Sequence, residues 1–86
     1  MYKIVYRKSV VKFIKKRVPQ EKERILQKFE MLKMNPYPDN ENTDIKKLQG
    51  KSGFRLRVGS YRFLYDVVDD ELVIYMEKAD NRGDVY

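Results

Sequence analysis

The sequence predicts one α+β domain, in which a small antiparallel sheet of about four strands carries a helical hairpin on one face. Two observations predict the sheet. Residues 54–65 alternate apolar and polar side chains around Gly59-Ser60, a dipeptide that suits a two-residue hairpin turn, and residues 72–78 alternate again. The helices are predicted because apolar side chains recur at helical spacing between residues 10 and 32. The expected order is β-α-α-β-β-β, in a single domain over residues 1–86.

The helical half opens with a short strand, Tyr2 to Arg7, and a helix that starts at Lys8 or Ser9. Ser9 suits the N-cap position because its hydroxyl can accept a hydrogen bond from the first turn. Pro19 fits the first turn of a second helix, where its missing N–H would have no partner anyway. Each helix has an apolar face, made of Val10, Phe13, Ile14 and Val18 in the first and of Ile25, Phe29 and Leu32 in the second.

The strand half follows a loop at 35–43 that is rich in turn-forming residues. Asp44 to Leu48 is expected to form a short helical turn. A loop centred on Asp69-Asp70 is expected to lead into the last strand, and this loop would place Arg62 opposite Glu77.

The hairpin concentrates arginines on one face of the predicted sheet. A turn at Gly59-Ser60 places Arg57 directly opposite Arg62, with Arg55 one diagonal step away. Like charges in this arrangement destabilise a sheet, and no acidic residue lies between Lys51 and Tyr65. The pattern therefore favours a face that receives an anion, with phosphate as the candidate because its oxygens match the guanidinium fork. The alternatives are ordinary solvated charges and an Arg62–Glu77 ion pair.

The composition limits the chemistry. The chain has no cysteine and no histidine, so neither a disulfide framework nor the commonest general base and metal ligand is available. We therefore expect no metal and no cofactor. The net charge of +6 points to nucleic acid or to an acidic protein partner. No apolar run is long enough to span a bilayer and no signal-peptide pattern opens the chain, so a soluble, cytoplasmic protein is expected.

The ordered set of motifs in the second half resembles the RelE/ParE superfamily of bacterial and archaeal toxins. The motifs are Leu48-Gln49-Gly50, Phe54-Arg55-Leu56-Arg57-Val58-Gly59, Tyr61-Arg62-Phe63-Leu64-Tyr65, Val73-Ile74-Tyr75, and the close at Arg82 and Val85-Tyr86. The resemblance implies the toxin of a type II toxin–antitoxin system, held silent by a cognate RelB-like antitoxin. In the RelE branch, such a toxin cuts mRNA in the ribosomal A site without metal or cofactor.

The resemblance also implies the site residues. Arg55 and Arg57 match basic residues of the family's second strand, Arg62 matches the arginine of the third, and Arg82 and Tyr86 match a late Arg/Tyr pair. Many relatives carry a histidine where this chain has Asn81. The arginines would stabilise the extra negative charge of the transition state. Tyr86 would assist proton transfer or stack on a base.

Two other functions compete with this interpretation. The first is a ParE-like inhibitor of DNA gyrase without enzymatic activity, in which the helical hairpin grips a protein target. The second is a basic RNA-binding module without catalysis, which the absence of histidine favours.

Overall fold

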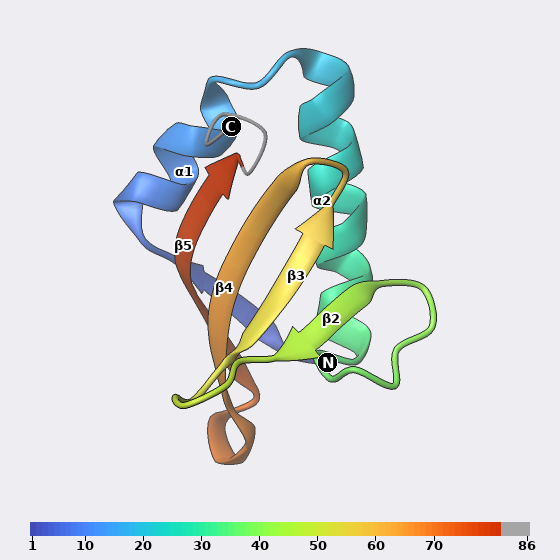
Figure 1. The fold of residues 1–86 in the computed structure, drawn as a ribbon, viewed down its shortest axis with the longest axis vertical. Helices are drawn as coiled ribbons and strands as arrows, with labels where there is room; N and C mark the ends of the chain where they lie inside the picture. Colours follow the sequence, from blue (N-terminus) through green and yellow to red (C-terminus); the bar gives the residue numbers. More distant parts are fainter. Residues whose placement is uncertain (82–86) are drawn as a thin grey trace.

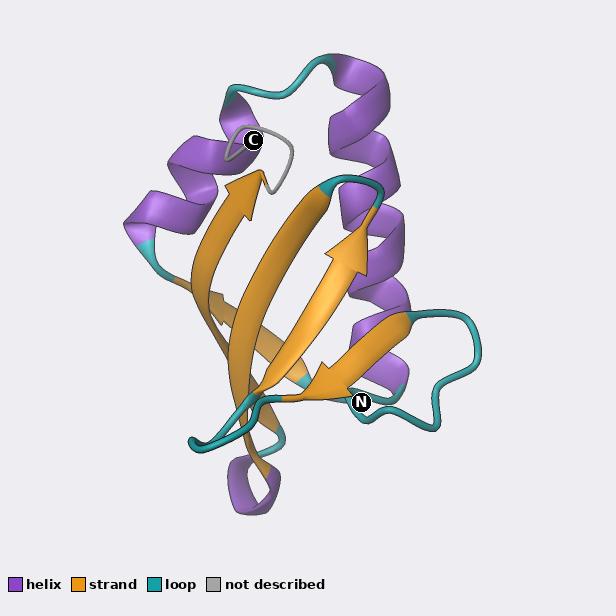
Figure 2. Cartoon of the chain, viewed as in Figure 1, coloured by secondary structure: helices purple, strands orange, loops and turns teal. Residues whose placement is uncertain are grey.

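The computed structural model describes residues 1–81, and in this range two α-helices pack against one face of a five-stranded sheet (Figures 1 and 2). The elements follow in the order β1 (Lys3–Tyr6), α1 (Lys8–Lys15), α2 (Pro19–Met34), β2 (Asp44–Lys47), β3 (Phe54–Val58), β4 (Tyr61–Val68), the 3₁₀ turn η1 (Asp69–Glu71) and β5 (Val73–Asn81). The predicted α+β class and the helices on one sheet face are confirmed.

The sheet is mixed, whereas the sequence predicted an antiparallel one. Its order is β1-β5-β4-β3-β2, and β1 runs parallel to β5 with Ile4 opposite Ile74. The other neighbours are antiparallel. Parallel neighbours need a long crossover, and here residues 7–72, with both helices, separate the two strands.

The fifth strand, β2, is the segment that the sequence predicted as a helical turn. Asp44–Lys47 pairs antiparallel with β3, and Ile45 is buried between the half-buried Asp44 and the exposed Lys46. Four residues are too few for periodicity to separate a strand from a turn. Residues 44–47 become a strand because they pair with the free edge of β3. Tertiary context commonly decides whether a short segment is a strand.

The helices begin close to where the sequence predicts. α1 starts at Lys8, but its N-cap is Arg7 and Ser9 lies inside the helix. α2 starts at Pro19 as predicted, and buries Ile25, Phe29 and Leu32. Val18 was expected on the apolar face of the first helix; it is instead the extended N-cap of α2 and is 61% exposed. No helix within residues 1–81 is long and apolar enough to cross a membrane.

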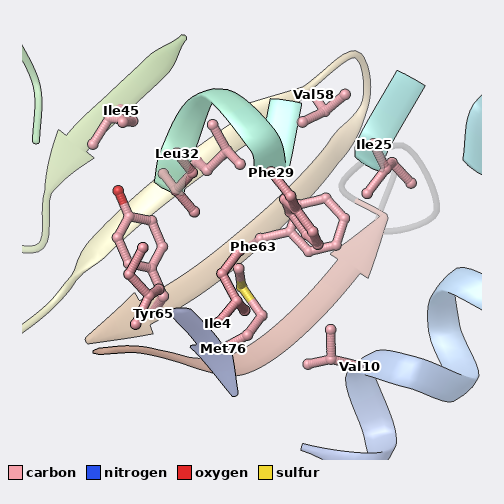
Figure 3. Close-up of a cluster of buried hydrophobic side chains, with 12 residues drawn as sticks. Ile4, Val10, Ile25, Phe29, Leu32, Ile45, Val58, Phe63, Tyr65 and Met76 are labelled. Carbon is pink, nitrogen blue, oxygen red and sulfur yellow. The ribbon is translucent and has the colours of Figure 1, made fainter. Parts of the chain in front are cut away.

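The core lies between the helices and the sheet (Figure 3). The Phe29 ring meets the Phe63 ring edge-on, with centroids 5.0 Å apart. Tyr65 is buried as well, and its hydroxyl donates to the Pro36 carbonyl at 2.7 Å, so the buried polar atom is paired. Burial raises the pKa of Tyr65. Leu72, the first residue of the alternating segment 72–78, is 48% exposed, because it adopts a left-handed conformation at the end of η1.

The hairpin of β3 and β4 has the predicted register. Val58 lies opposite Tyr61, Arg57 opposite Arg62 and Leu56 opposite Phe63. The turn requires a positive φ at its first residue, and Gly59 supplies φ 61°.

The pairing of β4 with β5 differs from the prediction. Arg62 lies opposite Asp80, and Glu77 is the extra residue of a bulge beside Leu64 and Tyr65. Two features cause the shift. The η1 turn and Leu72 move the start of β5 to Val73, where it pairs with Val68. The bulge then shifts the pairing of β5 with β4 by one further residue. Neither can be read from the alternation of apolar side chains.

One carboxylate joins three parts of the chain that are distant in sequence. Asp69 in η1 accepts hydrogen bonds from the hydroxyls of Tyr2, at 2.5 Å, and Tyr37, at 2.6 Å. These two hydrogen bonds lower the pKa of Asp69. The N-terminus and the loop after α2 are thereby fastened to the β4–β5 connection.

We predict that Gly53→Ala destabilises the protein much more than Gly50→Ala. Both glycines have positive φ, but a Cβ at Gly53 would lie 2.7 Å from the Tyr65 carbonyl oxygen, whereas nothing lies within 4 Å of one at Gly50. The free energy of unfolding, measured with urea, should fall by more than about 2 kcal/mol for Gly53→Ala and by about 1 kcal/mol for Gly50→Ala. Equal losses would contradict this description of the loop.

A second prediction concerns acid stability. Because the folded state lowers the pKa of Asp69, the stabilising effect of this carboxylate is present above its ordinary, unfolded pKa of 3.8. The effect is lost as pH falls through the lower pKa of the folded state. Asp69→Asn should therefore flatten the fall in unfolding free energy below pH 3.8. The double change Tyr2→Phe and Tyr37→Phe removes the donors and should flatten it similarly. If the unfolding free energy of both variants depends on pH as that of the wild type does, the assigned role of Asp69 is wrong.

Candidate phosphate-binding face

One face of the sheet points away from the helices and is here called the open face (Figure 1). It carries the arginines of the hairpin. Arg55 and Arg57 alternate along β3 with the buried side chains of Leu56 and Val58. Arg62 precedes the buried Phe63 on β4. Because side chains alternate across a strand, the three guanidinium groups share this face. The structure thus brings together three of the five predicted site residues.

Carboxylates on the neighbouring strands hold each of these arginines. Asp44 of β2 accepts from Arg55 Nη2 at 2.7 Å with one oxygen and from Arg57 Nε at 3.1 Å with the other. Asp80 of β5 accepts from Arg62 Nε and Nη2, both at 3.2 Å. The hairpin itself lacks acidic residues, as the sequence shows, but its two neighbours supply them. The opposed arginines are therefore stable without any bound anion.

Arg55 is the least accessible of the three. Its side chain is 14% exposed and its Nε is buried without a hydrogen-bond partner among the described residues. A cation so covered serves mainly to hold Asp44 in place. The sequence predicts Arg55 as a site residue; the structure leaves little of its side chain accessible, and its role stays a prediction.

Arg57 and Arg62 keep donors that point to solvent. The Arg57 side chain is 47% exposed and, among residues 1–81, forms hydrogen bonds only through Nε. The Arg62 side chain is 37% exposed, and Asp80 engages two of its nitrogens. A guanidinium group has five N–H donors, so both retain donors that no group within residues 1–81 engages. This facing pair can bind a phosphate-sized anion without rearrangement of the strands.

Two lysines extend the positive charge. Lys46 lies opposite Arg55 on one side, and Lys78 lies opposite Leu64 on the other. Both are exposed, and neither forms an ion pair with a carboxylate in the described range. The open face thus has cations on the four adjacent strands β2, β3, β4 and β5, which is the pattern of a surface that binds polyanions.

Two predicted site residues, Arg82 and Tyr86, lie outside the described residues. The last described residue, Asn81, lies opposite Tyr61 at the end of β5. The roles of Arg82 and Tyr86 therefore stay predictions. Within residues 1–81 no group of three or more acidic, histidine or cysteine side chains could hold a metal ion.

Sequence reasoning missed Asp44 and Asp80 as members of this face. Asp44 was missed because its segment was expected to be helical. Asp80 was missed because the predicted β4–β5 register placed Glu77 opposite Arg62. The alternation Asp44-Ile45-Lys46 is the available signal for the first. No local signal marks the second, since a bulge decides which residue of β5 meets Arg62.

Comparison with known proteins agrees with this fold. The chain is 33% identical to the RelE1 protein of Methanocaldococcus jannaschii over 86 residues, which is 99% of this chain and 94% of that protein. It resembles a chain of the archaeal RelE–RelB complex of Pyrococcus horikoshii with a TM-score of 0.82 and 30% identity, covering 95% and 96% of the two chains. It also resembles a chain of the RelB–RelE complex of Methanococcus jannaschii, with a TM-score of 0.74 and 26% identity, covering 95% of this chain and 94% of that one.

The mixed sheet with two helices on one face is the fold of these RelE chains, so the chain has the architecture of the small α+β toxins. Residues 2–77 match the family described as the ParE toxin of type II toxin–antitoxin systems. The chain therefore belongs to the RelE/ParE superfamily of type II toxins, as its motifs predicted.

We predict that Asp44 stabilises the fold more than Asp80. Asp44→Ala leaves the nearly buried Arg55 without its partner, and the unfolding free energy should fall by about 2 kcal/mol. Asp80→Ala frees a more exposed arginine, with a loss of about 1 kcal/mol or less. Urea denaturation of the two variants measures both values, and the reverse order would contradict the supporting position of Arg55.

Proposed function

We propose that this toxin is a ribosome-dependent endoribonuclease, which cleaves mRNA in the ribosomal A site and thereby arrests translation. The observation that carries the proposal is the facing pair Arg57 and Arg62 on the open face, with donors that remain available. A phosphate between two guanidinium groups is a common way to bind RNA. Membership of the RelE/ParE superfamily supports the same function.

The chemistry requires no group that the chain lacks. The 2′-hydroxyl oxygen of the RNA attacks the adjacent phosphorus, the bond to the 5′-oxygen breaks, and a cyclic phosphate results. One proton leaves the 2′-hydroxyl and one reaches the 5′-oxygen. The transition state gains negative charge on the phosphate oxygens, and fixed cations stabilise it most when they need no reorganisation. Asp44 and Asp80 hold Arg57 and Arg62 in this way.

The remaining predicted residues have distinct roles in the proposal. Arg55 is a positioning residue that acts through Asp44, because its own side chain is largely covered. Arg82 adds a further cation at the phosphate. Tyr86 transfers a proton or stacks on a base, because an arginine cannot act as a conventional base. No metal ion or cofactor takes part in the proposed step.

The proposed partners are the ribosome, its mRNA and a RelB-like antitoxin, and the proposed place of action is the cytoplasm. Two of the similar solved chains come from RelE–RelB complexes. The net charge of +6 suits both RNA and an acidic antitoxin segment.

Inhibition of DNA gyrase is a second candidate function, and one observation favours it. Val18, Leu26 and Met34 expose apolar side chains on and beside α2, on the helical side of the molecule. Exposed apolar groups of this kind suit a protein target. A supercoiling assay with purified gyrase separates the two functions, because only the second predicts inhibition in the absence of ribosomes.

We predict that Arg62→Ala and Arg57→Ala each lower the rate of mRNA cleavage by about 10²- to 10³-fold, because each removes a fixed cation from the phosphate. Mapping of cleavage ends on translated messages in a reconstituted system measures the rate. Lys12→Ala removes the same charge from exposed α1 and should leave the rate unchanged. Undiminished cleavage by both arginine variants would refute the proposed site.

A further inference from the structure

A groove lies on the open face directly beside the arginines. It encloses about 300 Å³, and Leu48 and Leu64 contribute apolar side chains to its lining. Leu64 is opposite Arg55 on one side and Lys78 on the other, so the groove is continuous with the phosphate-binding face. Successive residues on the same face of a strand are about 6.6 Å apart, so the step from Arg62 to Leu64 is short.

One wall of the groove is a tight loop between β2 and β3. The Leu48 N–H donates to the Gly53 carbonyl at 3.1 Å, which closes the loop. Lys47 Nζ donates to the carbonyls of Lys51 and Gly53, both at 3.3 Å. The loop touches β4 where Gly53, without a side chain, approaches the Tyr65 carbonyl. These contacts fix the wall in position before any ligand binds.

The polar groups of the groove combine cations at the rim with one available carboxylate. Lys51 and Lys78 are exposed at the rim. Glu77 also lines the groove, but Arg7 engages its carboxylate at 3.0 Å. Asp66 Oδ2 meets only a long contact of 3.5 Å from Ser52 Oγ, and Asp66 Oδ1 has no hydrogen-bond donor within residues 1–81. Asp66 is therefore the acceptor that a ligand would meet.

We propose that this groove binds the base of a nucleotide adjacent to the phosphate held by Arg57 and Arg62, and that Asp66 makes it favour bases with an exocyclic amino group over uracil. The inference deepens the proposed function and rests on it in taking RNA as the ligand. Proteins commonly bind single-stranded RNA with apolar side chains that contact the bases and with neighbouring cations that contact the phosphate backbone.

The preference follows from the hydrogen-bonding groups of the bases. Adenine, cytosine and guanine each present an amino group, which can donate to a carboxylate oxygen. The uracil edge presents a single N–H between two carbonyl oxygens, and these repel a carboxylate on both sides. A carboxamide at the same position offers both a donor and an acceptor. Asp66→Asn should therefore accept uracil without losing the other bases.

Nucleotide titrations followed by methyl NMR test the groove without requiring cleavage. AMP, CMP, GMP and UMP are added separately to the full-length toxin, and the methyl signals of Leu48 and Leu64 are followed. The first three should shift these signals, with apparent affinities about fivefold or more above that of UMP, the lower end of the discrimination that one base contact supplies. In Asp66→Asn the difference should shrink to less than about twofold. Asp70→Asn, an exposed change in η1, is the matched control and should keep the wild-type preference.

Cleavage mapping then separates this proposal from the proposed function. If the toxin cuts mRNA, Asp66→Asn should raise the share of sites with uracil in the groove severalfold at a similar total rate. Methyl shifts as expected without any cleavage would support the groove and contradict the nuclease. Cleavage with methyl signals that no nucleotide shifts, or with identical preferences in wild type and Asp66→Asn, would overturn the groove and leave the nuclease intact.

Discussion

The register of the β3–β4 hairpin is the constraint on which the rest of the structure depends. Gly59 permits a turn with positive φ, and the turn places Arg57 opposite Arg62 and Leu56 opposite Phe63. A shift by one residue would send the arginines into the core and the aromatic rings into solvent. The apolar half of the hairpin therefore fixes the position of its charged half. Packing of Phe63 beneath the helices holds the open face in place.

The open face combines two demands that conflict. An anion site gains from several cations close together, but a sheet loses stability when like charges face each other. Asp44 and Asp80 reduce the conflict from the flanking strands: Asp44 binds Arg55 and Arg57, and Asp80 binds Arg62, at 2.7 to 3.2 Å. Arg57 and Arg62 stay partly exposed, whereas the Arg55 side chain is largely covered. The same strands continue past Leu64 into the proposed base groove, so phosphate and base would bind to one rigid surface.

The predictions that succeeded concern residues whose neighbours are close in sequence. The hairpin register, the start of α2 at Pro19 and the buried side of β3 all follow from turn chemistry and periodicity. The failures concern pairing over longer distances. β2 becomes a strand because β3 offers it an edge, and β1 joins the sheet in parallel after a crossover of residues 7–72. The η1 turn and the bulge at Glu77 together shift the partner of Arg62 to Asp80.

The sequence by itself determined that the arginines of the hairpin share one face, because strand alternation and a glycine turn are local properties. It also determined the superfamily, through motifs that lie close together along the chain. Only the tertiary structure decided which carboxylates meet those arginines, how far Arg55 is covered, and that Leu48 and Asp66 line one groove. These facts depend on strand order and on a bulge, and both are set by the packing of segments that are distant in sequence.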